Sequence, residues 1–342
     1  MQNIFMLEDY LKKTKEINLK KLEKAIKSSV IEPSGQTKTY EIKIRSNPAF
    51  ASKSRIAPER ELRKIETASV SKQVSGNCFF CDPLEKGARF AKDTGLEKQY
   101  YLNDSVAFSN LFTSGKIHGV IIYNYKKHIT DPRNITLNNW LDGLKLVQEI
   151  GKESKKKYIS SNVNSGPKAA ASLEHFHGQF HCEDEPLAKT MLCMNITKRL
   201  AKKSKIWWKA WLKSMLKMGL VIDFDEESKT ALYVEWSPSF GKAELVIINL
   251  ENPCFLLSEV ETASVVKFLD RAIKITMDNV SDQFNIVNLS ASPKDDFCNQ
   301  FRVFPRAPLS SGVKSWEGYL ESMGETVPYI SPEKLAEIAR KH

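Results

Sequence analysis

Polar and apolar side chains alternate without interruption between residues 175 and 181. A period of two is typical of a β-strand, because successive side chains of an extended chain point to opposite faces of the sheet. The predicted strand presents on one face His175, His177, Gln179 and His181, and on the other Phe176, Gly178 and Phe180. The first face could bind or react with a ligand, and the second could pack against the core.

The same order of elements is predicted twice along the chain. Periodicity indicates a strand, a helix and a strand over residues 119–123, 137–151 and 158–164, and again over 244–249, 258–277 and 284–289. Residues 300–306 follow the second set and keep an alternating pattern, but they contain no histidine. We therefore expect an internal pseudo-repeat whose second copy lacks the histidine strand.

Three of the six histidines in the chain fall within residues 175–181, which core packing does not require. A single histidine is more often a buried or solvated polar residue, but the cluster favours a function. An imidazole can act as a nucleophile, a general base or a metal ligand. A carboxamide cannot exchange protons, although its N–H can hold a phosphate oxygen. The pattern suggests His177 as a nucleophile toward phosphorus, with Gln179 stabilising the charge that develops.

Small residues dominate the stretch from 164 to 172, just before this strand. Small side chains let a phosphate approach backbone amides closely, although neither a G-x-G-x-x-G nor a Walker A pattern is present. Asn164 and Ser172 add side-chain hydrogen-bond donors. Taken alone, this stretch predicts only a loop.

Cys78 and Cys81 form a C-x-x-C pair, which needs two further ligands to make a tetrahedral zinc site. Such a pair can equally be redox-active or incidental. The other four cysteines are scattered without regular spacing, as expected of small buried apolar residues. No signal peptide opens the chain, and no apolar run approaches the roughly 20 residues of a membrane span. We therefore expect a protein of the reducing cytoplasm.

The chain has 342 residues, of which 42% are hydrophobic, so it can bury a sizeable core as one large domain or two. Its net charge is +10, and Lys205, Lys209, Lys213 and Lys217 recur on one face of a predicted helix rich in tryptophan. Such a face is most often solvated. Binding of nucleic acid, a membrane surface or an acidic partner is the alternative, and an anionic substrate would also benefit from the positive field.

Several motifs together resemble one known family. The segment Asn164-x-Gly166, then Ser172, then His175-x-His177-x-Gln179, is similar to the galactose-1-phosphate uridylyltransferase branch of the histidine-triad superfamily. Further segments that resemble this branch are residues 57–63, the pair Asn103-Asp104, residues 318–326 and residues 331–333. The resemblance covers roughly residues 42 to 340.

The resemblance implies roles for residues in the catalytic centre. His177 would carry a nucleotidyl group, and Gln179 takes the place of the third histidine of the related hydrolases. Residues implied to bind the substrate are Arg60, Arg63, Asn103, Asp104, Asn164, Ser172 and Glu321.

The resemblance also completes the metal site. In the family, a histidine that ends a strand-to-loop passage and the first histidine of the His-x-His pair join the two cysteines. Here these ligands would be Cys78, Cys81, His128 and His175. With all four positions filled by protein, the zinc would be structural, and we expect one metal per chain.

The fold implied by the resemblance is α+β. Two histidine-triad-like halves, each an antiparallel sheet with helices, would form one pseudo-repeat unit. Residues 1–40 would be an N-terminal helical extension and 41–190 the half with the zinc site and the catalytic strand. Residues 191–230 would be a basic, Trp-rich helical connection, and 231–342 a degenerate second half.

The function implied is ping-pong transfer of UMP between a UDP-hexose and a hexose 1-phosphate, in a cytoplasmic enzyme of galactose and carbohydrate metabolism that forms a homodimer. Val327 and Ser105 depart from the family pattern near the sugar and the base, so uridylyl and adenylyl transfer are both open. The first alternative is a phosphorylase of dinucleoside polyphosphates or ADP-sugars. The second is a non-catalytic zinc protein that binds nucleotides or RNA.

Overall fold

The computed structural model describes residues 2–31, 36–57, 78–96, 99–306 and 318–342. Ten strands form the larger sheet: β4 (Tyr100–Leu102), β5 (Ser105–Ser109), β6 (Ile117–Ile122), β7 (Tyr158–Ser165), β8 (His177–Glu183), β9 (Val221–Asp225), β10 (Thr230–Val234), β11 (Leu245–Asn249), β12 (Phe284–Leu289) and β13 (Gln300–Pro305). The smaller sheet contains β1 (Glu23–Ile31), β2 (Thr37–Asn47), β3 (Ser52–Ile56) and β14 (Glu325–Thr326). The α-helices are α1 (Gln2–Tyr10), α2 (Pro83–Lys86), α3 (Leu137–Ser154), α4 (Ala188–Ala201), α5 (Ser204–Lys217), α6 (Glu259–Asn279), α7 (Tyr319–Ser322) and α8 (Pro332–Ala339).

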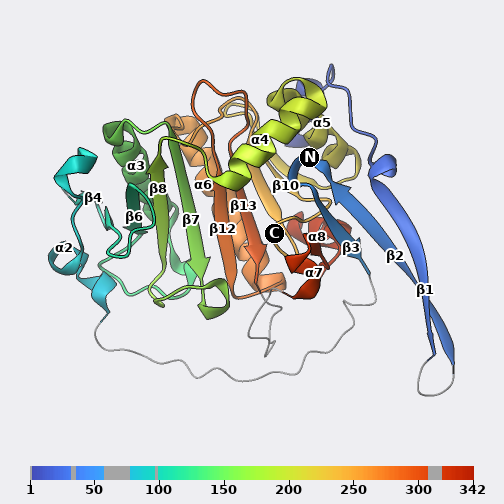
Figure 1. The fold of residues 1–342 in the computed structure, drawn as a ribbon, viewed down its shortest axis with the longest axis horizontal. Helices are drawn as coiled ribbons and strands as arrows, with labels where there is room; N and C mark the ends of the chain where they lie inside the picture. The colour runs from blue at the N-terminus through green and yellow to red at the C-terminus, as the bar shows by residue number, and fades with distance from the viewer. Residues whose placement is uncertain (1, 32–35, 58–77, 97–98, 307–317) are drawn as a thin grey trace.

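The order of strands in the larger sheet confirms the α+β fold and the pseudo-repeat. The order is β4-β5-β6-β8-β7 followed by β12-β13-β11-β10-β9, and the two series mirror each other about the β7–β12 junction (Figure 1). In each half a long helix, α3 or α6, connects the third strand to the fourth. The neighbouring strands pair antiparallel throughout.

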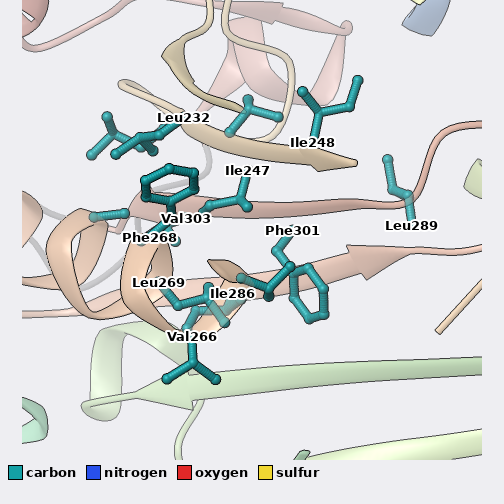
Figure 2. Close-up of a cluster of buried hydrophobic side chains, with 14 of the residues drawn as sticks. Leu232, Ile247, Ile248, Val266, Phe268, Leu269, Ile286, Leu289, Phe301 and Val303 are labelled. Atoms are coloured by element: carbon teal, nitrogen blue, oxygen red, sulfur yellow. The ribbon is translucent and has the colours of Figure 1, made fainter. Parts of the chain in front are cut away.

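Helices α3 and α6 cover one face of this sheet. Each begins where the sequence provides a capping box, at Thr136 for α3 and at Ser258 for α6. A Cβ at Gly151 of α3 would collide with Ile159 of β7, so glycine permits this close approach. Figure 2 shows Phe268 and Leu269 of α6 pointing toward the strands of the second half.

The opposite face of the second half is filled by side chains. Arg302 of β13 is fully buried, and its guanidinium forms ion pairs with Glu235 and Glu244. The rings of Phe50 and Trp208 lie 4.5 and 5.8 Å from that guanidinium. Because Trp208 belongs to α5, this helix helps to close the face of the second half that corresponds to the histidine face of the first.

The lysines of α5 contact other parts of the same chain. Lys213 donates hydrogen bonds to the backbone carbonyls of residues 11, 12 and 14, at 3.1, 3.2 and 2.7 Å. Lys205 and Lys209 bind Glu251, and Lys217 pairs with Glu16. The lysine face is therefore more than a solvated surface, because it binds other segments of the chain, although the side chain of Lys217 stays 61% exposed.

The N-terminal extension is only partly helical. Helix α1 covers the core as expected, with Leu7 and Leu11 fully buried. Residues 23–31, however, form β1, which pairs with β2 in a continuous antiparallel register from Glu23↔Arg45 to Ile31↔Thr37. Pairing with β2 satisfies the backbone of this segment, and a sequence rich in lysine does not reveal that partner.

The helical connection expected over residues 191–230 ends early. Helices α4 and α5 account for its first part, but residues 221–225 form β9, the edge strand of the second half. Val221 and Phe224 are buried there, beneath α1. Within the residues described, no helix combines the length and apolarity that a membrane-spanning segment needs.

We expect Arg302→Met to lower the free energy of unfolding by about 3–5 kcal/mol, because Glu235 and Glu244 would stay buried without their cation. Urea denaturation measures this loss. Arg55→Met is the matched control, since Arg55 pairs with Glu325 in a partly exposed position and its loss should cost less than about 1 kcal/mol. Equal, small losses in both variants would contradict the prediction.

Candidate active site and metal centre

The two cysteines and two of the histidines meet at one end of β8. Cys78 precedes a short 3-10 helix, Phe79–Cys81, and Cys81 is its last residue. His128 lies in the loop after β6, and His175 precedes β8. Their four ligand atoms all lie within 4.8 Å of one another. The structure thus brings together the four residues that the resemblance implied as metal ligands.

The distances between these atoms suit a tetrahedral metal. His175 Nδ1 lies 3.7 Å from Cys78 Sγ and 3.5 Å from Cys81 Sγ, and His128 Nδ1 lies 3.4 Å from Cys81 Sγ. Tetrahedral zinc with ordinary bonds to sulfur and nitrogen would separate such ligands by about 3.6 Å. Without a metal, burial and the neighbouring Cys78 raise the pKa of Cys81.

A backbone carbonyl orients His175 as a ligand. Its Nε2 lies 2.9 Å from the carbonyl oxygen of Asn124, which can only accept a hydrogen bond. Nε2 therefore carries the proton, and the lone pair of Nδ1 faces the two sulfurs. Histidine ligands of metals commonly have such a carbonyl partner behind the ring. Burial lowers the pKa of His175 to about 4, which keeps it neutral and able to coordinate.

Phe80, the second aromatic residue of the Cys-x-x-C loop, connects the metal centre to the histidine strand. Its ring packs in a small apolar cluster on β5 and β6 that includes Val106 and Ile122. The same ring lies edge-on to His177, with 4.8 Å between ring centroids. Sequence reasoning did not identify Phe80, although its position between two ligands was a usable signal.

His177 presents an unprotonated nitrogen. Its Nδ1 donates a hydrogen bond to the carbonyl oxygen of His175 at 2.8 Å, so Nε2 holds the lone pair. Only 4% of the residue is exposed, and burial lowers the pKa of His177. A neutral imidazole with a fixed tautomer and a free Nε2 is suited to nucleophilic attack.

Gln179 belongs to a hydrogen-bonded group with two histidines. Its Oε1 lies 3.1 Å from Nε2 of His118 on the neighbouring strand β6. The ring of His118 stacks on that of His181, with 4.1 Å between centroids. Sequence reasoning missed His118, because only the pairing of β6 with β8 brings it to this face. A lone polar side chain in an otherwise apolar buried strand was the available signal.

Asn164 lies near the nucleophile but is held by the second half. It follows Val163, which pairs with Gly178 on β8, and its Oδ1 accepts a hydrogen bond of 2.6 Å from Asn285. Asn285 in turn accepts a hydrogen bond from Arg306. Ser172 is exposed in the loop before β8, so its contact with a phosphate stays a prediction.

Asn103 and Asp104 form the tight turn between β4 and β5. Asn103 adopts a left-handed φ of 52° and donates to Asp142 of α3 at 3.0 Å. Asp104 pairs with Lys126 at 2.8 Å, in the segment that leads to His128. Ser105 is fully buried and donates to the carbonyl of Tyr123, so it anchors the strand and does not line an open site.

Glu321 does not lie near the nucleophile within one chain. It belongs to α7, where it pairs with Lys242 at 3.1 Å, and Figure 1 shows α7 well separated from β8. Val327 directly follows β14 and is buried. Arg60 and Arg63 lie outside the described residues.

The fold is similar to that of solved enzymes and enzyme-like proteins. A galT-like protein from Arabidopsis thaliana superimposes with a TM-score of 0.60 at 16% identity, covering 87% of this chain and 98% of that one. An ADP-glucose phosphorylase from the same plant, solved with bound ADP-glucose, gives 0.61 with the same identity and coverage. A uridylyltransferase gives 0.59 at 14% identity, over 87% of this chain and 97% of its own.

Sequence comparison adds nothing to this likeness, since no family model and no curated protein matches the chain. At identities of 14 to 16% the three structures establish the fold alone. The fold predicted from the resemblance, two antiparallel halves in one unit, is confirmed over most of the chain.

We expect Cys78→Ser to lose the bound metal and to melt at a lower temperature, because binding of a structural metal contributes directly to folding. Elemental analysis and thermal denaturation of the purified protein measure the two effects. Cys254→Ser is the control, since Cys254 is buried outside the cluster and already hydrogen-bonded to Asn252. An unchanged metal content in Cys78→Ser would overturn the assignment.

Proposed function

We propose that the protein is a nucleotidyltransferase that works through a nucleotidyl-His177 intermediate. The observation that carries the proposal is the state of His177: a buried, neutral imidazole whose Nδ1–H is bound to the carbonyl of His175 and whose Nε2 is free. Gln179 follows two residues later on the same face of β8. The similar fold of the ADP-glucose phosphorylase and the uridylyltransferase supports the same class of reaction.

In the first step, Nε2 of His177 attacks the α-phosphorus of a nucleotide sugar. An N–P bond forms, the bond from phosphorus to the bridging oxygen breaks, and sugar 1-phosphate leaves with the electron pair. In the second step, a phosphate oxygen of the acceptor attacks the same phosphorus, and His177 is released neutral. Two displacements replace one difficult exchange between two phosphate esters.

The protein accelerates such a reaction mainly by positioning and by hydrogen bonds to the developing charge. Gln179 offers its amide N–H groups, Asn164 lies on β7 before the loop that leads to His177, and Ser172 lies in that loop. Arg60 and Arg63 would add positive charge, and Asn103 and Asp104 would hold the nucleoside. A zinc ion held by Cys78, Cys81, His128 and His175 would supply rigidity at the start of β8.

The preferred substrates are a UDP-hexose and a hexose 1-phosphate. The alternative is a phosphorylase, in which inorganic phosphate intercepts the intermediate formed from an ADP-sugar or a dinucleoside polyphosphate. The nearly equal likeness to a uridylyltransferase and to an ADP-glucose phosphorylase keeps both acceptors in the proposal. Activity with inorganic phosphate but not with hexose 1-phosphate would favour the second.

A non-catalytic zinc protein that binds RNA is the weaker alternative. It would use the lysine face of α5, but those lysines bind Glu251, Glu16 and the backbone after α1.

A role in galactose metabolism in the cytoplasm is part of the preferred proposal. So is a homodimer, in which a second copy could bring its Glu321 to the sugar.

We expect His177→Ala to retain its metal and its melting temperature but to form no covalent intermediate. The wild-type protein is mixed briefly with UDP-glucose, ADP-glucose or diadenosine tetraphosphate without an acceptor, and its intact mass is measured. An added mass of UMP supports uridylyl transfer, whereas an added mass of AMP supports the phosphorylase. Leu111→Ala, an exposed position on the loop before β6, is the control and should form the adduct as the wild type does.

Two outcomes would contradict this proposal. An adduct of the same size in His177→Ala would show that another residue is the nucleophile. The absence of any adduct in the wild type, combined with nucleotide binding that weakens steeply as salt rises, would favour the binding protein.

A further inference from the structure

A histidine on the strand beside β8 lies within hydrogen-bond distance of the carboxamide of Gln179. His118 is on β6, and only 6% of it is exposed. The register pairs it with His181 of β8, and its Nε2 lies 3.1 Å from Oε1 of Gln179. Its role follows from which of its two ring nitrogens carries the proton.

The backbone of Ser114 decides that tautomer. Its N–H lies 3.1 Å from Nδ1 of His118 and points at it. A backbone N–H can only donate, so Nδ1 must hold the lone pair and the proton of the neutral ring is on Nε2. This Nε2–H can then donate to an acceptor, and Oε1 of Gln179 is in reach.

Asn110 does not compete for this proton. Its Nδ2 lies 3.2 Å from Nε2 of His118, but its own oxygen accepts the backbone N–H of Phe112 at 2.9 Å. The nitrogen of that amide therefore faces the ring. Two donors cannot bond to each other, so the amide hydrogens of Asn110 must point away from the proton on Nε2, and the tautomer is assigned from the backbone N–H of Ser114. Gln179 is left as the acceptor among the described residues.

We propose that His118 is a positioning residue, which through its Nε2–H fixes the carboxamide oxygen of Gln179 and turns the N–H groups away from itself, toward the phosphoryl group that His177 receives. The inference rests on the proposed function and deepens it. A free carboxamide can rotate by half a turn and present its oxygen to the phosphate, which would repel the negative charge. The hydrogen bond from His118 removes that orientation.

The ring of His181 stacks on the ring of His118 and holds its orientation. The two rings lie 16° from parallel, and Ser114 Oγ contacts both, at 3.2 Å from Nδ1 of His118 and 3.0 Å from Nε2 of His181. Burial, with a smaller contribution from His118, lowers the pKa of His181 to about 4. The stack is thus not disrupted by a charge on His181 in the neutral pH range.

The first test reads the tautomer directly and needs no activity. Protein labelled with nitrogen-15 in its histidines is studied by NMR without ligand, and the signals of His118 are identified by their loss in His118→Phe. We expect a protonated Nε2 and an unprotonated Nδ1. The opposite tautomer would overturn the proposal whatever the protein catalyses.

The second test is a double-mutant cycle on the rate of adduct formation in a single turnover. His118→Phe keeps the stack on His181 but removes the hydrogen-bond donor. We expect the rate to fall about 10–100-fold, with little change in the affinity for the nucleotide sugar. His118→Gln restores an amide N–H near the position of Nε2 and should recover most of the rate. When Gln179→Ala is already present, His118→Phe should lower the rate by less than a further factor of about two, because both changes remove the same contribution.

Lys116→Ala is the matched control on the same loop, since Lys116 is exposed and pairs with Asp93 at the surface. Its rate should equal that of the wild type. Losses that multiply in the double variant, together with a lower melting temperature, would reduce His118 to a structural residue and overturn the proposal. A normal rate in His118→Phe would overturn it as well. If the wild type itself forms no adduct, the proposed function fails, and the catalytic role of His118 fails with it.

Discussion

Two hydrogen bonds from imidazole rings to backbone carbonyls determine the chemistry at the start of β8. His175 donates from Nε2 to Asn124, and His177 donates from Nδ1 to His175, at 2.9 and 2.8 Å. The two histidines therefore have opposite tautomers although they are only two residues apart. One ring turns its lone pair to the cysteine sulfurs, and the other keeps its lone pair for a substrate. Phe80 links both, because its ring packs edge-on against the rings of His175 and His177, with 6.3 and 4.8 Å between centroids.

The two halves of the pseudo-repeat differ on one face of the sheet: the first half carries the histidine strand, and the second carries buried ion pairs. A single row of paired residues crosses the junction: Gln179 faces Asn162, which faces Val287, which faces Arg302. At one end of the row the polar side chain is available to a ligand. At the other end Arg302 is enclosed by two carboxylates and aromatic rings, so that face binds α5 and not a substrate. The buried ion pairs of the second half thus occupy the place that the histidines occupy in the first.

Local pattern predicted much of this arrangement. The repeated order of strand, helix and strand appears in the structure, and so does the histidine strand, although β8 begins at His177 and not at residue 175; both depend on side chains close in sequence. What the sequence could not predict depends on partners distant in sequence. His118 reaches Gln179 only through the pairing of β6 with β8, and the lysines of α5 find carbonyls after α1. The strand β1 was missed for the same reason, because its partner is β2.

The groups that fix Gln179 act through their dipoles, although the chain as a whole is strongly basic. Gln179, the neutral ring of His118 and the low-pKa ring of His181 supply dipoles, and backbone groups fix their directions. A positive charge, such as Arg60 and Arg63 would add, acts on the phosphates of substrate and transition state as a whole. Fixed dipoles instead favour the charge distribution that appears at the reacting phosphorus, and they need no reorganisation when it appears. Orientation, set by hydrogen bonds from one strand to the next, is therefore what this fold contributes beside its nucleophile.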